Sequence, residues 1–79
     1  MEYIELSEDY GILEVPAPKS WVGKTLKGLN VRAKHSVNII AIEGETGVNV
    51  SPAADYEIHE KDILVVLGDN YSLEAVQKL

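Results

Sequence analysis

Two short runs of apolar residues constrain the fold of this chain more than any other feature. Residues 37–42 are apolar and largely β-branched except at Asn38, and residues 63–67 are entirely apolar. Runs of this length and composition are typical of strands, because a buried helix needs about ten residues or more. Residues 37–42 would place apolar side chains on both strand faces, which predicts a central strand covered on both sides.

Three further segments have the pattern of shorter strands. Residues 3–6 and 11–15 are extended segments on either side of an acidic turn. Residues 48–50 follow a glycine-containing turn and predict a short return strand.

One helix is predicted after residue 22. Gly28 lowers its helix propensity by about 1 kcal/mol relative to Ala, so we expect it to be short and broken near Leu29 and Asn30. Its apolar face is predicted from residues at helical spacing, which are Val22, Leu26, Leu29 and Ala33.

A second helix is predicted at the C-terminal end. Asn70 is suited to cap its first turn, where Glu74 would favour the helix dipole. Its apolar face is expected to consist of Leu73, Val76 and Leu79.

The order of elements is strand, helix, strand, strand, strand, helix. This order predicts an α+β fold, close to an α/β sandwich, in which two helices pack on a small mixed sheet. The 79 residues have room for one domain only. A core this small is often completed by a second copy, so we expect a homodimer. In the connection 53–61 we expect Tyr56 and Ile58 to point inward.

The charge is distributed unevenly along the chain. The net charge of −6 argues against binding a nucleic-acid polymer. Residues 15–42 nevertheless contain no acid and hold five of the seven basic residues. A basic segment in an acidic protein predicts a small anionic ligand, although a chance group of solvated lysines is an equal alternative.

Composition also bears on the compartment. The chain has no cysteine, which excludes a disulfide framework and thiolate metal sites. Its longest purely apolar run, residues 63–67, is far short of the roughly 20 residues that span a bilayer. No signal peptide is recognisable at the start. We therefore expect a cytoplasmic protein without direct membrane insertion.

No catalytic or metal-binding motif is present. The two histidines, His35 and His59, are too far apart for a zinc pair, and neither a nucleophile elbow nor a phosphate-binding glycine loop occurs. We expect no enzyme activity, no catalytic residue and no resident metal. A divalent cation held by Glu43, Glu45 and Asp55 is the alternative that the carboxylates leave open.

The basic segment contains residues suited to a nucleotide. Arg32 offers a planar guanidinium to phosphate oxygens, and Asn38 offers a carboxamide that both donates and accepts. Leu29, Val31 and Ile39 could form an apolar floor for a flat ring.

Each of these residues also has a structural alternative. Arg32 could pair with Asp62 or Glu60, Asn38 could satisfy a strand-edge carbonyl, and His35 could stabilise the end of a helix.

A longer pattern carries a family resemblance. From Gly23 the chain reads Gly-Lys-Thr-Leu-x-x-Leu-Asn-Val-Arg-x-Lys-His-x-x-Asn-Ile-Ile-Ala-Ile. This pattern and the later Asp-Ile-Leu-Val-Val-Leu-Gly run from Asp62 resemble the TrkA-C domain, also called the C-terminal RCK domain. The resemblance extends from about residue 11 to 79. It implies one domain over residues 1–79, in which residues 1–10 are an extension or the remnant of a preceding linker.

The resemblance also implies a function. Family members form dimers within cytosolic subunits that gate potassium transporters, channels and antiporters, and several bind cyclic di-AMP in the dimer cleft. Such a domain would act at the inner face of the membrane through its transporter partner, or would serve only for dimerisation. By position in the pattern, Asn30 stands where an acid is common and Ser36 where glycine is usual. The ligand-binding residues implied are Asn30, Arg32, Ala33, Lys34, His35, Asn38, Ile39 and Pro52.

Overall fold

The strands form one sheet in the order β1-β2-β5-β3-β4, and every neighbouring pair is antiparallel. The computed structural model describes residues 2–79. The two apolar runs of the sequence lie in β3 and β5, which are adjacent at the centre of the sheet. The strands are β1 (Tyr3–Glu5), β2 (Tyr10–Pro16), β3 (Val37–Gly44), β4 (Gly47–Val50) and β5 (Ile63–Asp69).

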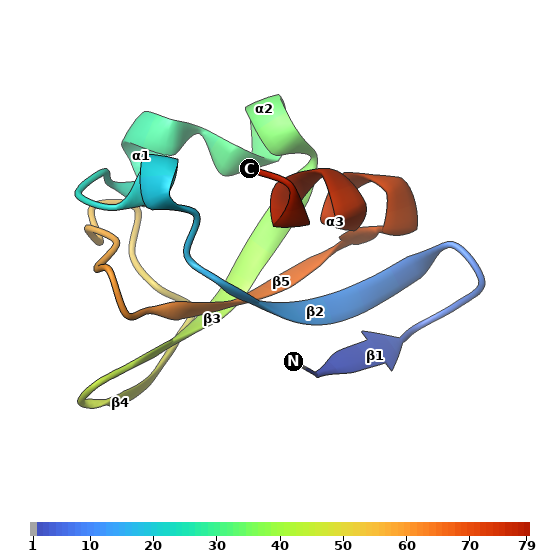
Figure 1. The fold of residues 1–79 in the computed structure, drawn as a ribbon, viewed down its shortest axis with the longest axis horizontal. Helices are drawn as coiled ribbons and strands as arrows, with labels where there is room; N and C mark the ends of the chain where they lie inside the picture. The colour runs from blue at the N-terminus through green and yellow to red at the C-terminus, as the bar shows by residue number, and fades with distance from the viewer. Residues whose placement is uncertain (1) are drawn as a thin grey trace.

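The helices all lie over one face of this sheet (Figure 1). A single 3-10 turn, η1, precedes them and places Trp21 in the core. This arrangement confirms the predicted α+β fold with helices packed on a small sheet, but the sheet is antiparallel throughout and not mixed, because no helix crosses over between two neighbouring strands. The helical elements are η1 (Lys19–Trp21), α1 (Leu26–Leu29), α2 (Val31–His35) and α3 (Asn70–Gln77).

The core lies between the helices and the sheet. The alternating burial of β5 shows the position of the core, since Leu64 and Val66 are fully buried whereas Val65 is only half-buried. The expectation that Tyr56 and Ile58 point inward is confirmed, with Ile58 fully and Tyr56 partly buried. The core residues are Leu13, Val15, Trp21, Leu29, Val31, Val37, Ile42, Ile58, Leu64, Val66, Leu73 and Val76.

The prediction that residues 37–42 are covered on both faces is wrong. Asn38 and Ile40 are exposed, because the helices cover only one side of the sheet. A β-bulge between Ile39 and Ala41 also shifts the pairing of β3 with β5. The apolar run therefore marks a central strand whose second face is open in the monomer.

The predicted break in the first helix is confirmed. Asn30 adopts the left-handed conformation, with φ 50°, and separates α1 from α2. The change of direction buries Val31 and exposes Ala33, so the assignment of Ala33 to the apolar face was wrong. A periodic pattern follows one helical face only while the helix is continuous.

The last helix begins one residue earlier than its sequence suggested. Asp69, not Asn70, is the N-cap, and its carboxylate accepts from the Ser72 amide at 2.8 Å. This hydrogen bond lowers the pKa of Asp69. Leu73 and Val76 are buried as predicted, whereas Leu79 lies beyond the helix end and is exposed.

Asn70 instead connects α3 to the hairpin formed by β1 and β2. Its carboxamide accepts from the Tyr3 hydroxyl and donates to the Glu8 carbonyl, both at 2.9 Å. The Tyr3 ring lies 2.6 Å from where a Cβ on Gly11 would be, so a larger residue at position 11 would require the ring to move. Residues 3–5 are thus part of the sheet, and their origin as a linker stays a prediction.

Within residues 2–79, no helix is long and apolar enough to cross a membrane.

Candidate functional site

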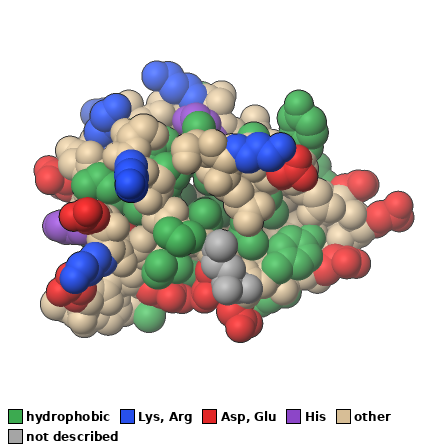
Figure 2. Space-filling view, viewed as in Figure 1, with side chains coloured by type: hydrophobic (Ala, Val, Ile, Leu, Met, Phe, Trp, Pro, Cys, Tyr) green, Lys and Arg blue, Asp and Glu red, His purple; other side chains and the backbone are tan. Residues whose placement is uncertain are grey.

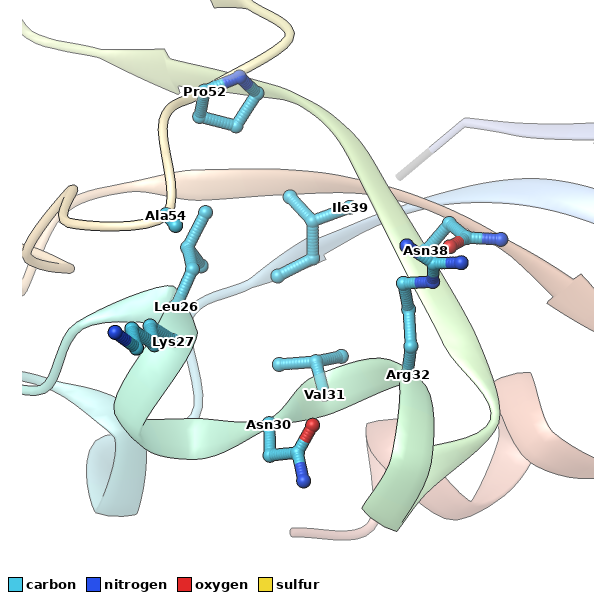
Figure 3. A pocket seen from close by; sticks show the side chains of 9 residues that line it. All are labelled: Leu26, Lys27, Asn30, Val31, Arg32, Asn38, Ile39, Pro52 and Ala54. Atoms are coloured by element: carbon cyan, nitrogen blue, oxygen red, sulfur yellow. The ribbon is translucent and has the colours of Figure 1, made fainter.

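A surface cavity of about 450 Å³ lies between the helices α1 and α2 and the strand β3 (Figure 3). We call it the Arg32 cavity. Four parts of the chain contribute to it: α1, the Asn30 break with α2, the start of β3, and the segment after β4. Its lining residues are Leu26, Lys27, Asn30, Val31, Arg32, Asn38, Ile39, Pro52 and Ala54.

Backbone hydrogen bonds fix the walls of the cavity. The amide of Lys27 donates to the Ala54 carbonyl at 2.8 Å, and the amide of Leu26 donates to the Tyr56 carbonyl at 3.1 Å. The start of α1 is also capped by Thr25, whose hydroxyl accepts from the Gly28 amide at 3.0 Å. The helix α1 is therefore attached along the segment that carries Pro52 and Ala54.

Strained backbone gathers around this cavity. Within residues 2–79, the residues other than glycine with positive φ are Asn30, Ser36 and Ser51. Asn30 lines the cavity, Ser36 joins α2 to β3, and Ser51 directly precedes Pro52. Residues with a Cβ occupy this conformation at a cost, and such residues cluster at functional sites.

The cavity has a cationic rim over an apolar floor. Lys27 and Arg32 line it, no acidic side chain does, and neither cation forms an ion pair within residues 2–79. In Figure 3 the Arg32 side chain lies beside Asn38, whereas Lys27 lies on the other side of the floor. In Figure 2 most of the visible Lys and Arg side chains lie at the upper side of the molecule, toward α1 and α2. Two unpaired cations are free to bind an anion.

Five of the eight predicted ligand-binding residues line this cavity. They are Asn30, Arg32, Asn38, Ile39 and Pro52.

The other three predicted residues lie outside the lining. Ala33 and Lys34 are exposed on α2. His35 is half-buried, and its ring packs against Trp21 with centroids 5.1 Å apart.

The sequence pattern did not identify Leu26, Lys27 or Ala54 as lining residues, and it misplaced Leu29. Leu29 belongs to the core, and the floor is made by Leu26, Val31 and Ile39. Lys27 and Arg32 are five positions apart, which in a continuous helix would turn their side chains roughly 140° from each other. The break at Asn30 brings them to one cavity, and helical periodicity contains no signal for that.

In a second group of polar residues, the members form hydrogen bonds with one another. Asp62 is only 3% exposed, and its Oδ2 accepts from the Tyr56 hydroxyl at 2.7 Å and from the His59 amide at 2.9 Å. We call Tyr56, His59 and Asp62 the Asp62 cluster. Burial, with the hydrogen bond to Asp62, raises the pKa of Tyr56 to about 12. The suggested pairing of Arg32 with Asp62 or Glu60 is therefore wrong for the described residues.

The carboxylates do not form a metal site. Within residues 2–79, no group of three or more His, Cys, Asp or Glu side chains is placed to hold a metal ion. The suggested site at Glu43, Glu45 and Asp55 is therefore wrong. The carboxyl group of Glu43 instead meets that of Glu14, and this hydrogen bond raises the pKa of Glu43.

Comparison with known families decides the relationship of this chain. A sequence profile of the TrkA-C domain matches residues 11–79. The chain belongs to this family. It is 40% identical over 78 residues to the Ktr system potassium uptake protein C of Bacillus subtilis (strain 168), which covers 99% of this chain and 35% of that protein. The chain thus spans about a third of the length of this TrkA-C relative.

Two solved structures of TrkA-C relatives contain a ligand. The RCK C domain of the potassium transport protein KtrA, in complex with cyclic diadenosine monophosphate (c-di-AMP), has a TM-score of 0.79 and 30% identity, covering 85% of this chain and 79% of that one. The RCK_C domain dimer of BusR from S. agalactiae, in complex with c-di-AMP, has a TM-score of 0.70 and 28% identity, covering 89% and 91%.

Proposed function

We propose that this TrkA-C domain binds cyclic di-AMP in the Arg32 cavity, between two copies of the chain, and so regulates potassium uptake. One observation carries the proposal. Residues from α1, α2, β3 and the segment after β4 converge on a cavity with two unpaired cations, two carboxamides and an aliphatic floor. Phosphate, nucleobase and ribose require these groups.

Arg32 is assigned to the phosphate. Its guanidinium lies beside Asn38 at the rim, and no acid within residues 2–79 neutralises it. A guanidinium binds two phosphate oxygens at once, and the Asn38 carboxamide adds a donor. Ile39 and Pro52 provide the apolar surface against which an adenine ring would lie.

The ligand supports a dimer as the binding unit. Cyclic di-AMP has two equivalent halves, and a twofold-symmetric ligand fits a cleft to which two copies contribute the same residues. Ala33, Lys34 and His35 lie on α2 beyond the cavity, and we assign to them contacts made across this cleft.

Exposed apolar side chains on β3 and β4 support a contact between copies. Val48 and Val50 on β4 are 65% and 71% exposed, and Ile40 on β3 is 37% exposed. Burying such side chains against a second copy would stabilise the dimer.

Regulation would follow from ordering the dimer cleft. A ligand shifts a conformational equilibrium only by binding one state more tightly than the other. A dinucleotide bound to both Arg32 side chains would favour the arrangement in which they face each other. In the whole protein, this arrangement of the dimer would change the activity of a membrane potassium transporter that it contacts at the cytoplasmic face.

Isothermal titration with cyclic di-AMP tests the proposal. We expect one ligand per two chains, and a loss of affinity of about 100-fold or more for Arg32→Ala, because a desolvated phosphate loses its partner in both copies. Lys24→Ala is the control, since Lys24 is an exposed cation of the same segment that does not line the cavity. Absence of heat and of a thermal shift with the unaltered chain would reject ligand binding.

A ligand-independent dimerisation module is the second candidate. The exposed side chains of Ile40, Val48 and Val50 favour it, because burying them against a second copy would stabilise a dimer whether or not a nucleotide is present. Light scattering and thermal melting of the unaltered chain, with and without cyclic di-AMP, separate the two functions. Under the second candidate the unaltered chain is a dimer whose mass and melting temperature cyclic di-AMP does not change, whereas under the first the ligand raises its melting temperature.

A further inference from the structure

Lys27 is the one cation of the Arg32 cavity for which sequence reasoning gave no role. It is exposed, lines the cavity and forms no ion pair within residues 2–79. The backbone of Lys27 is nevertheless held in place, because its amide donates to the Ala54 carbonyl at 2.8 Å in the wall of the cavity.

The place of Lys27 differs from that of Arg32. Figure 3 shows Arg32 with Asn38 on one side of the aliphatic floor and Lys27 with Leu26 and Ala54 on the other. The cavity thus has cationic groups at two ends, with Val31 and Ile39 between them. We call the end with the guanidinium and the Asn38 carboxamide the Arg32 pole, and the end with the ammonium the Lys27 pole.

Resting on the proposed function, we infer that Lys27 is a specificity-determining residue that donates a hydrogen bond to a ring nitrogen of the adenine. With the phosphate at the Arg32 pole, the flat base lies over the aliphatic floor and its outer edge faces the Lys27 pole. An ammonium has three donors and no acceptor, so it recognises acceptor atoms on that edge and not an amino group.

Adenine presents such acceptors. Its ring nitrogens accept hydrogen bonds, whereas its exocyclic amine donates. The amine requires an acceptor of its own, and the Asn30 carboxamide, which also lines the cavity, has one. Lys27 and Asn30 together would therefore select a base edge that alternates acceptor and donor.

The test uses Lys27→Met with cyclic di-AMP and titration calorimetry. Methionine retains an unbranched apolar stem and the backbone amide that bonds to Ala54, so we expect the fold to be retained. One dinucleotide would lose a hydrogen bond in each of two copies, and we expect affinity to fall about 30-fold. Lys24→Met is the matched control, because it removes the same charge three positions away and outside the cavity.

Ligand analogues identify the atom that Lys27 contacts. In three analogues N1, N3 or N7 of both adenines is replaced by a C–H group. We expect one of them to bind the unaltered chain about 30-fold more weakly and to bind Lys27→Met as well as cyclic di-AMP does.

Three outcomes would overturn the inference. The first is unchanged affinity in Lys27→Met, and the second is an equal loss in Lys24→Met, which would indicate a general charge effect. The third is an additive loss with every analogue, which would show that Lys27 contacts no ring nitrogen. In each of these outcomes the unaltered chain still binds cyclic di-AMP, so the proposed function stands. That function fails separately if the unaltered chain does not bind.

Discussion

The Arg32 cavity and the Asp62 cluster are two polar regions of one small domain with opposite properties. In the Asp62 cluster, a buried carboxylate is satisfied by the Tyr56 hydroxyl and the His59 amide. In the Arg32 cavity, the cations are exposed and have no partner within residues 2–79, and the backbone around them is strained at Asn30, Ser36 and Ser51.

The difference teaches how polar groups divide between structure and function in this chain. Polar groups that pair with each other stabilise the fold and have nothing left for a ligand. Groups held apart by strained backbone add little stability and remain free to bind. The expected effects of substitutions should therefore separate into unfolding for one region and ligand affinity for the other.

The largest effect on stability is expected for Asp62→Ala. The substitution removes the buried carboxylate that accepts from the Tyr56 hydroxyl and the His59 amide, which should cost about 3 kcal/mol of unfolding free energy. Urea denaturation measures it, with the exposed Asp55→Ala as the control. A loss no larger than that of the control would show that the cluster does not stabilise the fold.

Tyr56→Phe should have about half that effect. It removes the hydrogen bonds of the hydroxyl to the Asp62 carboxylate and to His59 Nδ1 and retains the ring, so we expect a loss of about 1.5 kcal/mol in the same denaturation experiment. Asp62 keeps the His59 amide as a donor. Equal losses in Tyr56→Phe and Asp62→Ala would mean that the hydroxyl alone accounts for the cluster.

The same hydroxyl should make stability depend on alkaline pH. The pKa of Tyr56 is raised from 10.0 to about 12 in the folded chain. The protonated form is the one that folding favours, so its contribution is complete below pH 10 and is lost as the pH rises toward 12. Thermal melting across this range should show a decline that Tyr56→Phe reduces. An unchanged decline in the variant would assign it to other groups.

Ser36→Gly should stabilise the chain by about 1 kcal/mol or somewhat less. Ser36 has φ 58°, a conformation that glycine adopts without the steric cost of a Cβ. The gain in melting temperature would show that backbone strain beside the Arg32 cavity is real. Ser72→Gly, in the helix α3, is the opposite control and should destabilise the chain.

The smallest effect on stability is expected for Arg32→Ala. Arg32 is exposed and has no ion-pair partner within residues 2–79, so the free energy of unfolding should change by less than about 0.5 kcal/mol. The same variant is expected to lose ligand affinity. A loss of stability comparable to that of Asp62→Ala would contradict the division between the two regions.

Local patterns were sufficient for much of the fold. The runs at residues 37–42 and 63–67 predicted the central strands, and Gly28 with Asn30 predicted the break in the first helix. Such features depend on propensity and periodicity within a few residues. The predicted cover over both faces of β3 failed, because the number of layers on a sheet depends on where the helices pack.

The candidate site was only partly predictable. The pattern around Arg32 and Asn38 pointed to five residues that now line one cavity, but it did not reveal Leu26, Lys27 or Ala54. Their inclusion requires the left-handed Asn30 and the hydrogen bond from the Lys27 amide to Ala54. These contacts join segments far apart in sequence, so no local pattern encodes them.

By itself the sequence determined the types of elements, their order and the cationic, acid-free character of residues 15–42. Only the tertiary structure decided which cations share a cavity and which acid is buried among its own donors. The physical reason is that charge and propensity belong to single residues, whereas pairing and burial depend on which segments the sheet brings together.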